Sequence, residues 1–105
     1  MLKSFELISH AGNAKSFYME AVQAANAGDF EKANEKIEEG NVEYNAAHQM
    51  QTDYLVRMAN GEEIIADVLM IHSQDHLTSA SIIKDMAIQI IFMQKEILEL
   101  KGKIK

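Results

Sequence analysis

The sequence of 105 residues contains no cysteine, no proline and no tryptophan, and only five glycines. Because cysteine is absent, the chain can form no disulfide framework, no thiolate nucleophile and no cysteine-based metal site. Because proline is absent and glycine is scarce, long helices meet few interruptions. Three tyrosines and four phenylalanines leave few aromatic side chains for pairing between strands. These absences predict an all-α fold.

Other absences exclude whole classes of function. The longest apolar runs are a few residues, far short of a membrane span, and no charged lead, apolar core and cleavage site of a secretory signal is visible. The formal net charge of −6 argues against a nucleic-acid surface, which requires clustered cations. We therefore expect a soluble, cytoplasmic protein with no nucleic-acid partner and no direct membrane insertion. The length allows one domain over residues 1–105.

Two segments carry small and apolar residues in steps of three and four, the spacing of one buried helix face. They predict a first helix over about residues 4–27 and a second over about residues 30–59. Gly28 suits a left-handed cap and Asp29 an N-cap, so both predict the first turn, and Asn60-Gly61 predicts the second. The predicted buried faces comprise Leu7, Ala11, Ala14, Tyr18, Ala21 and Ala25 in the first helix, and Phe30, Ala33, Ile37, Gly40, Tyr44, Ala47, Gln51, Tyr54 and Met58 in the second.

The third predicted helix runs from Glu62 to Lys101 and carries two apolar rows. A helix that is apolar on two sides must be buried on two sides. One side can pack on the first two helices, and the other is expected to pack on further copies of this chain. The first row comprises Val68, His72, Asp75, Ser79, Ile82, Met86, Ile90, Met93, Ile97 and Leu100, and the second includes Ile64, Ile71, Ile83, Ala87 and Ile91.

The segment His72–His76 places two histidines and an aspartate on one side of this helix, because residues three and four apart are neighbours. One interpretation is a structural polar layer that fixes register near a symmetry axis. A second is the zinc-protease pattern His-x-x-Glu-His. We reject it because an aspartate replaces the glutamate, no third ligand is evident, and the chain is too small for a protease cleft. The other histidines, His10 and His48, have no comparable neighbours in the sequence.

A third interpretation is phosphoryl transfer through histidine. Neutral imidazole is a good nucleophile near pH 7 and forms covalent intermediates. A second histidine and an amide can donate hydrogen bonds to the oxygens of the transferred group. His72, His76 and Gln74 supply these residue types. On spacing alone, the polar layer and the phosphoryl acceptor both stay open.

The same segment carries a resemblance to a known family. It reads His72-Ser73-Gln74-Asp75-His76-Leu77-Thr78. It is similar to the core motif His-(Ala/Gly)-Gln-Asp-His-Leu-Met-Thr of the IIA components in the lactose/cellobiose (chitobiose) branch of the bacterial phosphoenolpyruvate-dependent sugar phosphotransferase system. Further matches follow in order and span most of the chain: Ala11-Gly12-Asn13-Ala14-Lys15-Ser16, Glu20-Ala21, Ala27-Gly28-Asp29-Phe30, Ile37-Glu38-Glu39-Gly40, Ala47-His48 and Gln51-Thr52-Asp53.

The resemblance implies a homotrimer of three-helix bundles, with the third helices around the axis. It implies that His72 accepts a phosphoryl group on Nε2 from the histidine-containing phosphocarrier protein and passes it to a cysteine of the cognate IIB component. Gln74 and His76 match positions that contact the phosphoryl group. Asp75 from three subunits would share a divalent cation such as Mg²⁺, a hard ion that prefers oxygen ligands.

The sequence departs from the family motif at two points. Ser73 replaces a small apolar residue, and the methionine expected after Leu77 is missing, so that Thr78 follows directly. A different class of function, a non-enzymatic helical oligomerisation or regulatory adaptor with a His/Asp polar layer, is the alternative. Because a IIA component contacts proteins rather than the sugar, the sequence does not specify which disaccharide, such as lactose or cellobiose, is taken up.

Overall fold

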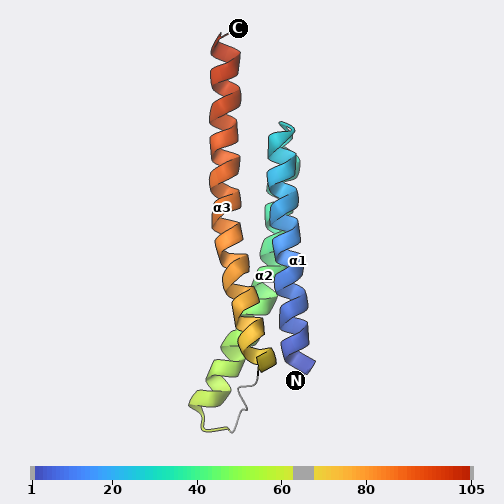
Figure 1. Cartoon of the computed structure of the whole chain (residues 1–105), viewed down its shortest axis with the longest axis vertical. Helices are drawn as coiled ribbons and strands as arrows, with labels where there is room; N and C mark the ends of the chain where they lie inside the picture. Colours follow the sequence, from blue (N-terminus) through green and yellow to red (C-terminus); the bar gives the residue numbers. More distant parts are fainter. Residues whose placement is uncertain (1, 63–67, 105) are drawn as a thin grey trace.

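The computed structural model describes residues 2–62 and 68–104, and this part of the chain consists of three helices joined by turns, without a strand. Figure 1 shows α1 (Leu2–Asn26), α2 (Phe30–Ala59) and α3 (Val68–Ile104) running up, down and up along one long axis. The predicted all-α class and three-helix bundle are confirmed. The predicted bounds of the second helix agree with those of α2, and those of the first agree with α1 to within two residues.

The turn between α1 and α2 shows how one short sequence can end one helix and start another. Gly28 adopts a φ of 83°, which glycine reaches without the penalty of a side chain. Its N–H donates to the Ala25 carbonyl at 3.0 Å, and that of Asp29 donates to the Ala24 carbonyl at 2.9 Å. This pair of bonds is the Schellman arrangement. The Asp29 carboxylate then accepts from the backbone N–H of Lys32 at 3.1 Å, so it caps α2 as predicted.

The predicted start of the third helix is wrong. Glu62 lies outside any helix and completes the end of α2: its N–H donates to the Arg57 carbonyl at 3.2 Å, and Arg57 Nε donates to its carboxylate at 3.3 Å. An acidic residue after the positive-φ Gly61 suits the end of one helix as well as the start of the next, so sequence alone misassigned it. Residues 63–67, including Ile64 of the second predicted apolar row, lie outside the described residues.

The core follows the predicted face of α1 along its whole length. All six predicted residues are buried, and four of them are alanines, which allow neighbouring helices to approach closely. From α2 the core receives Ala33, Gly40 and Ala47, and from α3 it receives Met70, Ser73, Leu77, Ala80, Ala87 and Ile91.

Tyr18 is the largest side chain in this core. Its hydroxyl donates to Oδ1 of Asn41 at 2.8 Å, and burial, together with the nearby Tyr44, raises its pKa to about 12. The ring lies against the backbone of α2 at Gly40. A Cβ at Gly40 would lie 2.5 Å from Cε1 of Tyr18, so this position requires glycine for space rather than for backbone freedom.

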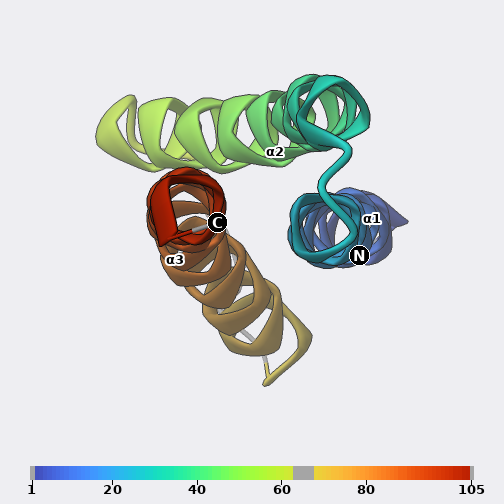
Figure 2. The same cartoon turned by 90° about the horizontal axis from the view of Figure 1, so that it is seen from above.

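The bundle is a rod with extents of 64 × 19 × 19 Å. Figures 1 and 2 show α1 and α2 as a hairpin with α3 alongside, and the end of α3 extends beyond the α1–α2 turn. None of the helices in the described ranges is long and apolar enough to cross a bilayer.

The first apolar row predicted for α3 is the side that the other two helices leave uncovered. Ile71 was predicted in the second row, but it is exposed and lies on the uncovered side. The residues of the second row that α1 and α2 bury are Ala87 and Ile91. The exposed apolar residues centred on the side of Asp75 are Ile71, Ile82, Met86, Met93, Ile97 and Leu100. Exposed apolar surfaces of this kind are typical of protein interfaces.

Substitutions of two glycines by alanine should distinguish the effect of the close contact between Gly40 and Tyr18 from the effect of helix propensity. Gly40→Ala forces Cβ into the Tyr18 ring and should lower the free energy of unfolding by about 1–3 kcal/mol. Gly12→Ala is the matched control, because nothing lies within 4 Å of the position that its methyl group would occupy, and alanine is the better helix former. It should raise the free energy by up to about 1 kcal/mol. Denaturant unfolding followed by circular dichroism measures both; equal effects would contradict the packing argument.

Candidate functional site

The two histidines of the motif meet on the N-terminal third of α3. His72 is exposed and His76 half-buried, one turn apart. Their Nε2 atoms lie 3.0 Å apart, and their rings meet edge to face with centroids 4.5 Å apart and an interplanar angle of 83°. At this distance one Nε2 carries the proton and donates, while the other accepts with its lone pair.

A lysine of α1 completes the group. Lys15 Nζ lies 2.8 Å from Nδ1 of His76 and donates to Oγ of Ser79 at 3.1 Å. The Ser79 hydroxyl donates in turn to the backbone carbonyl of His76 at 3.0 Å. Helical spacing predicts that His72, His76 and Ser79 lie on one side of a helix. It does not predict the contact with Lys15, because nothing in the sequence shows which residues of α1 lie opposite those of α3.

The environment of His76 favours its neutral form. Burial lowers the pKa of His76, and the positive charge of Lys15 and the proximity of His72 lower it further, against an opposing effect of Asp75. His76 is therefore neutral at pH 7, with one N–H and one lone pair available for hydrogen bonding.

Gln74 points away from this group. It lies two residues from each histidine, and such residues project to nearly opposite sides of a helix. The half-buried Gln74 lines a small hollow between the helices with Ser4, Met50 and Tyr54. The structure therefore brings His72 and His76 together and leaves Gln74 of the same chain on another side of α3.

The two departures from the family motif have simple structural settings. Ser73 is buried, and its hydroxyl donates to the Met70 carbonyl at 2.7 Å, so the added polar atom is satisfied inside the core. Leu77 is buried, whereas Thr78, which follows in place of the methionine, is exposed. The hydrophobic packing of this turn is thus provided by Leu77.

Asp75 is exposed on the uncovered side of α3. Within the described ranges, no three histidine, aspartate or glutamate side chains of one chain cluster in a way that could hold a metal ion. A carboxylate is a suitable ligand for Mg²⁺, but a site built on Asp75 requires further oxygen ligands from other chains.

The remaining histidines serve the bundle. His10 of α1 contacts the carboxylate of Glu43 on α2 through Nδ1, and His48 stacks on Tyr44 with ring centroids 6.1 Å apart. Neither joins the group around His72, as expected from the sequence.

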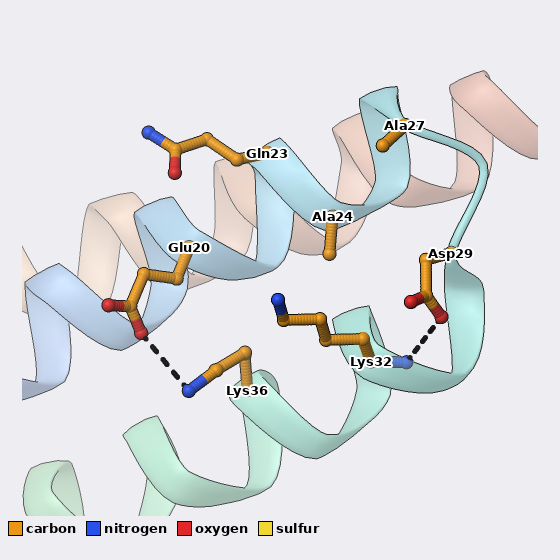
Figure 3. Close-up of a pocket in the computed structure, with 7 residues that line it drawn as sticks. All are labelled: Glu20, Gln23, Ala24, Ala27, Asp29, Lys32 and Lys36. Atoms are coloured by element: carbon orange, nitrogen blue, oxygen red, sulfur yellow. Dashed lines mark hydrogen bonds and ion pairs between the residues drawn. The ribbon is translucent and has the colours of Figure 1, made fainter.

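A separate hollow of about 370 Å³ lies between α1 and α2 beside their turn (Figure 3), at the opposite end of the hairpin from the start of α3 (Figure 1). Glu20 and Lys36 form an ion pair across it at 3.4 Å, and the Asp29 cap closes one end. Its lining contains no histidine and no group poised for nucleophilic chemistry. The candidate site is therefore the exposed group on α3, not this hollow.

Comparison with known proteins places the chain in a family. The family model described as "PTS system, Lactose/Cellobiose specific IIA subunit" matches residues 2–95. The chain is 42% identical over 98 residues to the lichenan-specific phosphotransferase enzyme IIA component of Bacillus subtilis, covering 93% of this chain and 89% of that protein.

Solved structures show the same bundle. The cellobiose-specific enzyme IIA of Bacillus anthracis superposes with a TM-score of 0.90 at 40% identity, covering 96% of this chain and 92% of that one. IIA(Chitobiose), solved in its complex with HPr, shares the fold with a TM-score of 0.81 at 22% identity, covering 90% and 92%. The chain therefore belongs to the lactose/cellobiose-specific IIA family of the sugar phosphotransferase system, as a IIA component of cellobiose/lactose-type sugar uptake.

Proposed function

We propose that His72 is the phosphoryl acceptor of this IIA component, and that Nε2 is the atom that forms the bond to phosphorus. The observation that carries the proposal is the exposed His72 ring, whose Nε2 faces Nε2 of His76 at 3.0 Å. An exposed nucleophile suits a protein that must meet two successive protein partners. A neighbouring N–H donor suits a group whose oxygens bear the charge during transfer.

The transfer balances without an added co-reactant. The donor is a phosphohistidine whose ring carries a proton on its other nitrogen. As the Nε2 lone pair of His72 forms the new bond to phosphorus, the donor's phosphorus–nitrogen bond breaks and its electron pair returns to the donor ring. His72 keeps the proton on Nδ1, so the charge that the donor loses appears on His72. Phosphoryl transfer of this kind depends mainly on positioning and electrostatic stabilisation.

The donor in this proposal is the histidine-containing phosphocarrier protein, and the acceptor is a cysteine of the cognate IIB component. The chitobiose-specific relative in complex with HPr supports the first partner by analogy. This chain has no cysteine, so a thiol acceptor must belong to another protein. The net charge of −6 favours encounter with basic partner surfaces.

We further propose a homotrimer with α3 of each chain around the axis. The uncovered apolar side of α3 would be buried, and Asp75 would face the axis with its two symmetry mates. Three close carboxylates repel one another, and a shared divalent cation such as Mg²⁺ would offset that repulsion. The cation would supply structural charge balance in the assembly.

This arrangement also gives Gln74 a role. At ~100° per residue, His72 and His76 lie on one side of Asp75 around the helix and Gln74 lies on the other. Around a threefold axis, these two sides of neighbouring chains face each other. Gln74 would therefore reach the phosphoryl group on His72 of a neighbouring chain, while His76 contacts it within the same chain.

Labelling with phosphoenolpyruvate, enzyme I and the phosphocarrier tests the acceptor. We expect one acid-labile, base-stable phosphate per wild-type chain and background labelling in His72→Ala. His76→Ala should still be labelled, but about 10- to 100-fold more slowly, because a hydrogen bond to a charged group is lost. His48→Ala is the control histidine substitution and should label as wild type does. Persistent labelling of His72→Ala would show that another residue is the acceptor.

The same experiment decides between the phosphocarrier and the adaptor. A helical adaptor with a polar His/Asp layer would assemble normally and take up no phosphate from the phosphocarrier. Failure of the wild-type chain to become labelled, with a donor shown to label another IIA component, would favour the adaptor.

The axial cation is tested by Asp75→Leu. Removal of the carboxylate should keep or raise the stability of the trimer and should make its thermal midpoint insensitive to a chelator, because no axial repulsion is left. Wild type should lose stability when the chelator is added. Gln89→Leu adds an apolar group to the same exposed side of α3 without removing a carboxylate, so it should stay chelator-sensitive. Sedimentation and thermal unfolding measure both; a wild type unaffected by the chelator would argue against the cation.

A further inference from the structure

We propose that Lys15 is a positioning residue for phosphoryl transfer: its ammonium group fixes which nitrogen of His76 carries the proton, and through His76 it fixes the tautomer of His72. The contacts that carry this inference are Lys15 Nζ to His76 Nδ1 at 2.8 Å and His76 Nε2 to His72 Nε2 at 3.0 Å. The inference rests on the proposed role of His72 as the phosphoryl acceptor.

The direction of these bonds follows from the chemistry of lysine. An ammonium group has three donors and no acceptor, so Nδ1 of His76 must accept from it with a lone pair. A neutral imidazole has one N–H, and that proton is then on Nε2 of His76. The His76 N–H faces His72, whose Nε2 accepts it with its own lone pair. His72 therefore carries its proton on Nδ1 and keeps Nε2 as the nucleophile.

The core places the backbone of Lys15, and two hydrogen bonds hold its ammonium group. It lies on α1 next to the buried Ala14 and one turn from the buried Ala11, and it is half-buried itself. A second hydrogen bond, to Oγ of Ser79, holds the ammonium at 3.1 Å beside the next turn of α3. Because the Ser79 hydroxyl already donates to the His76 carbonyl, it can only accept from Lys15.

This arrangement serves both halves of the transfer. Before transfer, the His76 N–H orients the acceptor ring of His72. During transfer this hydrogen bond breaks, because the Nε2 lone pair of His72 is needed for the bond to phosphorus, and the His76 N–H that it releases can then donate to a phosphoryl oxygen. Without Lys15, His76 could place its proton on either nitrogen, and one of the two tautomers would turn a lone pair toward the negatively charged group. Lys15 thus acts through His76 and needs no contact with phosphate.

The kinetic test uses Lys15→Met, which keeps an unbranched side chain one atom shorter and removes the donor. We expect phosphorylation of His72 to slow by about tenfold or more in kcat, with little change in KM for the phosphocarrier, because the docking surface is unaltered. Lys15→Arg, another donor without an acceptor, should recover most of the rate. Lys32→Met, which removes the same charge beside the α1–α2 turn, is the control and should behave as wild type.

A double variant separates positioning from direct action. If Lys15 acts through His76, Lys15→Met should slow His76→Ala hardly at all, since the ring that it orients is gone. Additive losses would show that Lys15 acts on the phosphoryl group directly and would overturn the proposal. Equal losses in Lys15→Met and Lys15→Arg would also overturn it, because they would point to packing rather than hydrogen-bond donation.

Imidazole nitrogen NMR spectra provide a readout that needs no phosphate. At a pH where the ring is neutral, His76 should show a proton on Nε2 in wild type and in Lys15→Arg, and a mixture of tautomers in Lys15→Met. Unchanged spectra in Lys15→Met would overturn the proposal. If wild type takes up no phosphate, the proposed function fails on that result alone, and the spectra still decide whether Lys15 sets the tautomer.

Discussion

The close packing of α1 against both other helices is the constraint on which the rest of the structure depends. The buried side of α1 is built largely from alanines, and where Tyr18 interrupts them, α2 supplies a glycine whose Cβ would overlap the ring. Small residues bring helix backbones close and leave little freedom to slide, because each protruding side chain has one matching gap. The register of α1 against α3 is fixed in this way, and so is the distance from Lys15 to His76.

The second consequence of this packing is a helix with one side uncovered. Two neighbours can bury only part of a helix surface, and α3 uses that part for Leu77, Ala80, Ala87 and Ile91. The apolar residues on the side of Asp75 are left exposed in a single chain, at about half of their surface or more for Ile82, Met86 and Met93. The division of α3 into an inner and an outer side explains why the same helical turn can hold both a hydrogen-bond chain to α1 and an exposed side that the proposed trimer would bury.

Much of the fold was predictable from the sequence because local rules and global packing agree. The predicted face of α1 is buried residue for residue, and the Gly28-Asp29 turn has the predicted caps. The start of α3 was not predictable, because Glu62 is compatible with the end of one helix or the start of the next. Its hydrogen bonds to Arg57 show that it belongs to the end of α2. Within the site, helical spacing predicted that His72 and His76 meet, whereas the contact with Lys15 spans 61 residues of sequence and depends on the register of two helices.

The direction of the hydrogen bonds in the site depends on Lys15, the one side chain among them that can donate but cannot accept. Each histidine and the hydroxyl of Ser79 can donate or accept, so a chain made of these groups alone could run in either direction. Because the ammonium of Lys15 can only donate, Nδ1 of His76 accepts from it. Nε2 of His76 then carries the proton and donates to Nε2 of His72. In the proposed function, the nucleophilic lone pair of His72 is thus determined by a group on another helix, and the close packing of α1 against α3 sets the distance between the two.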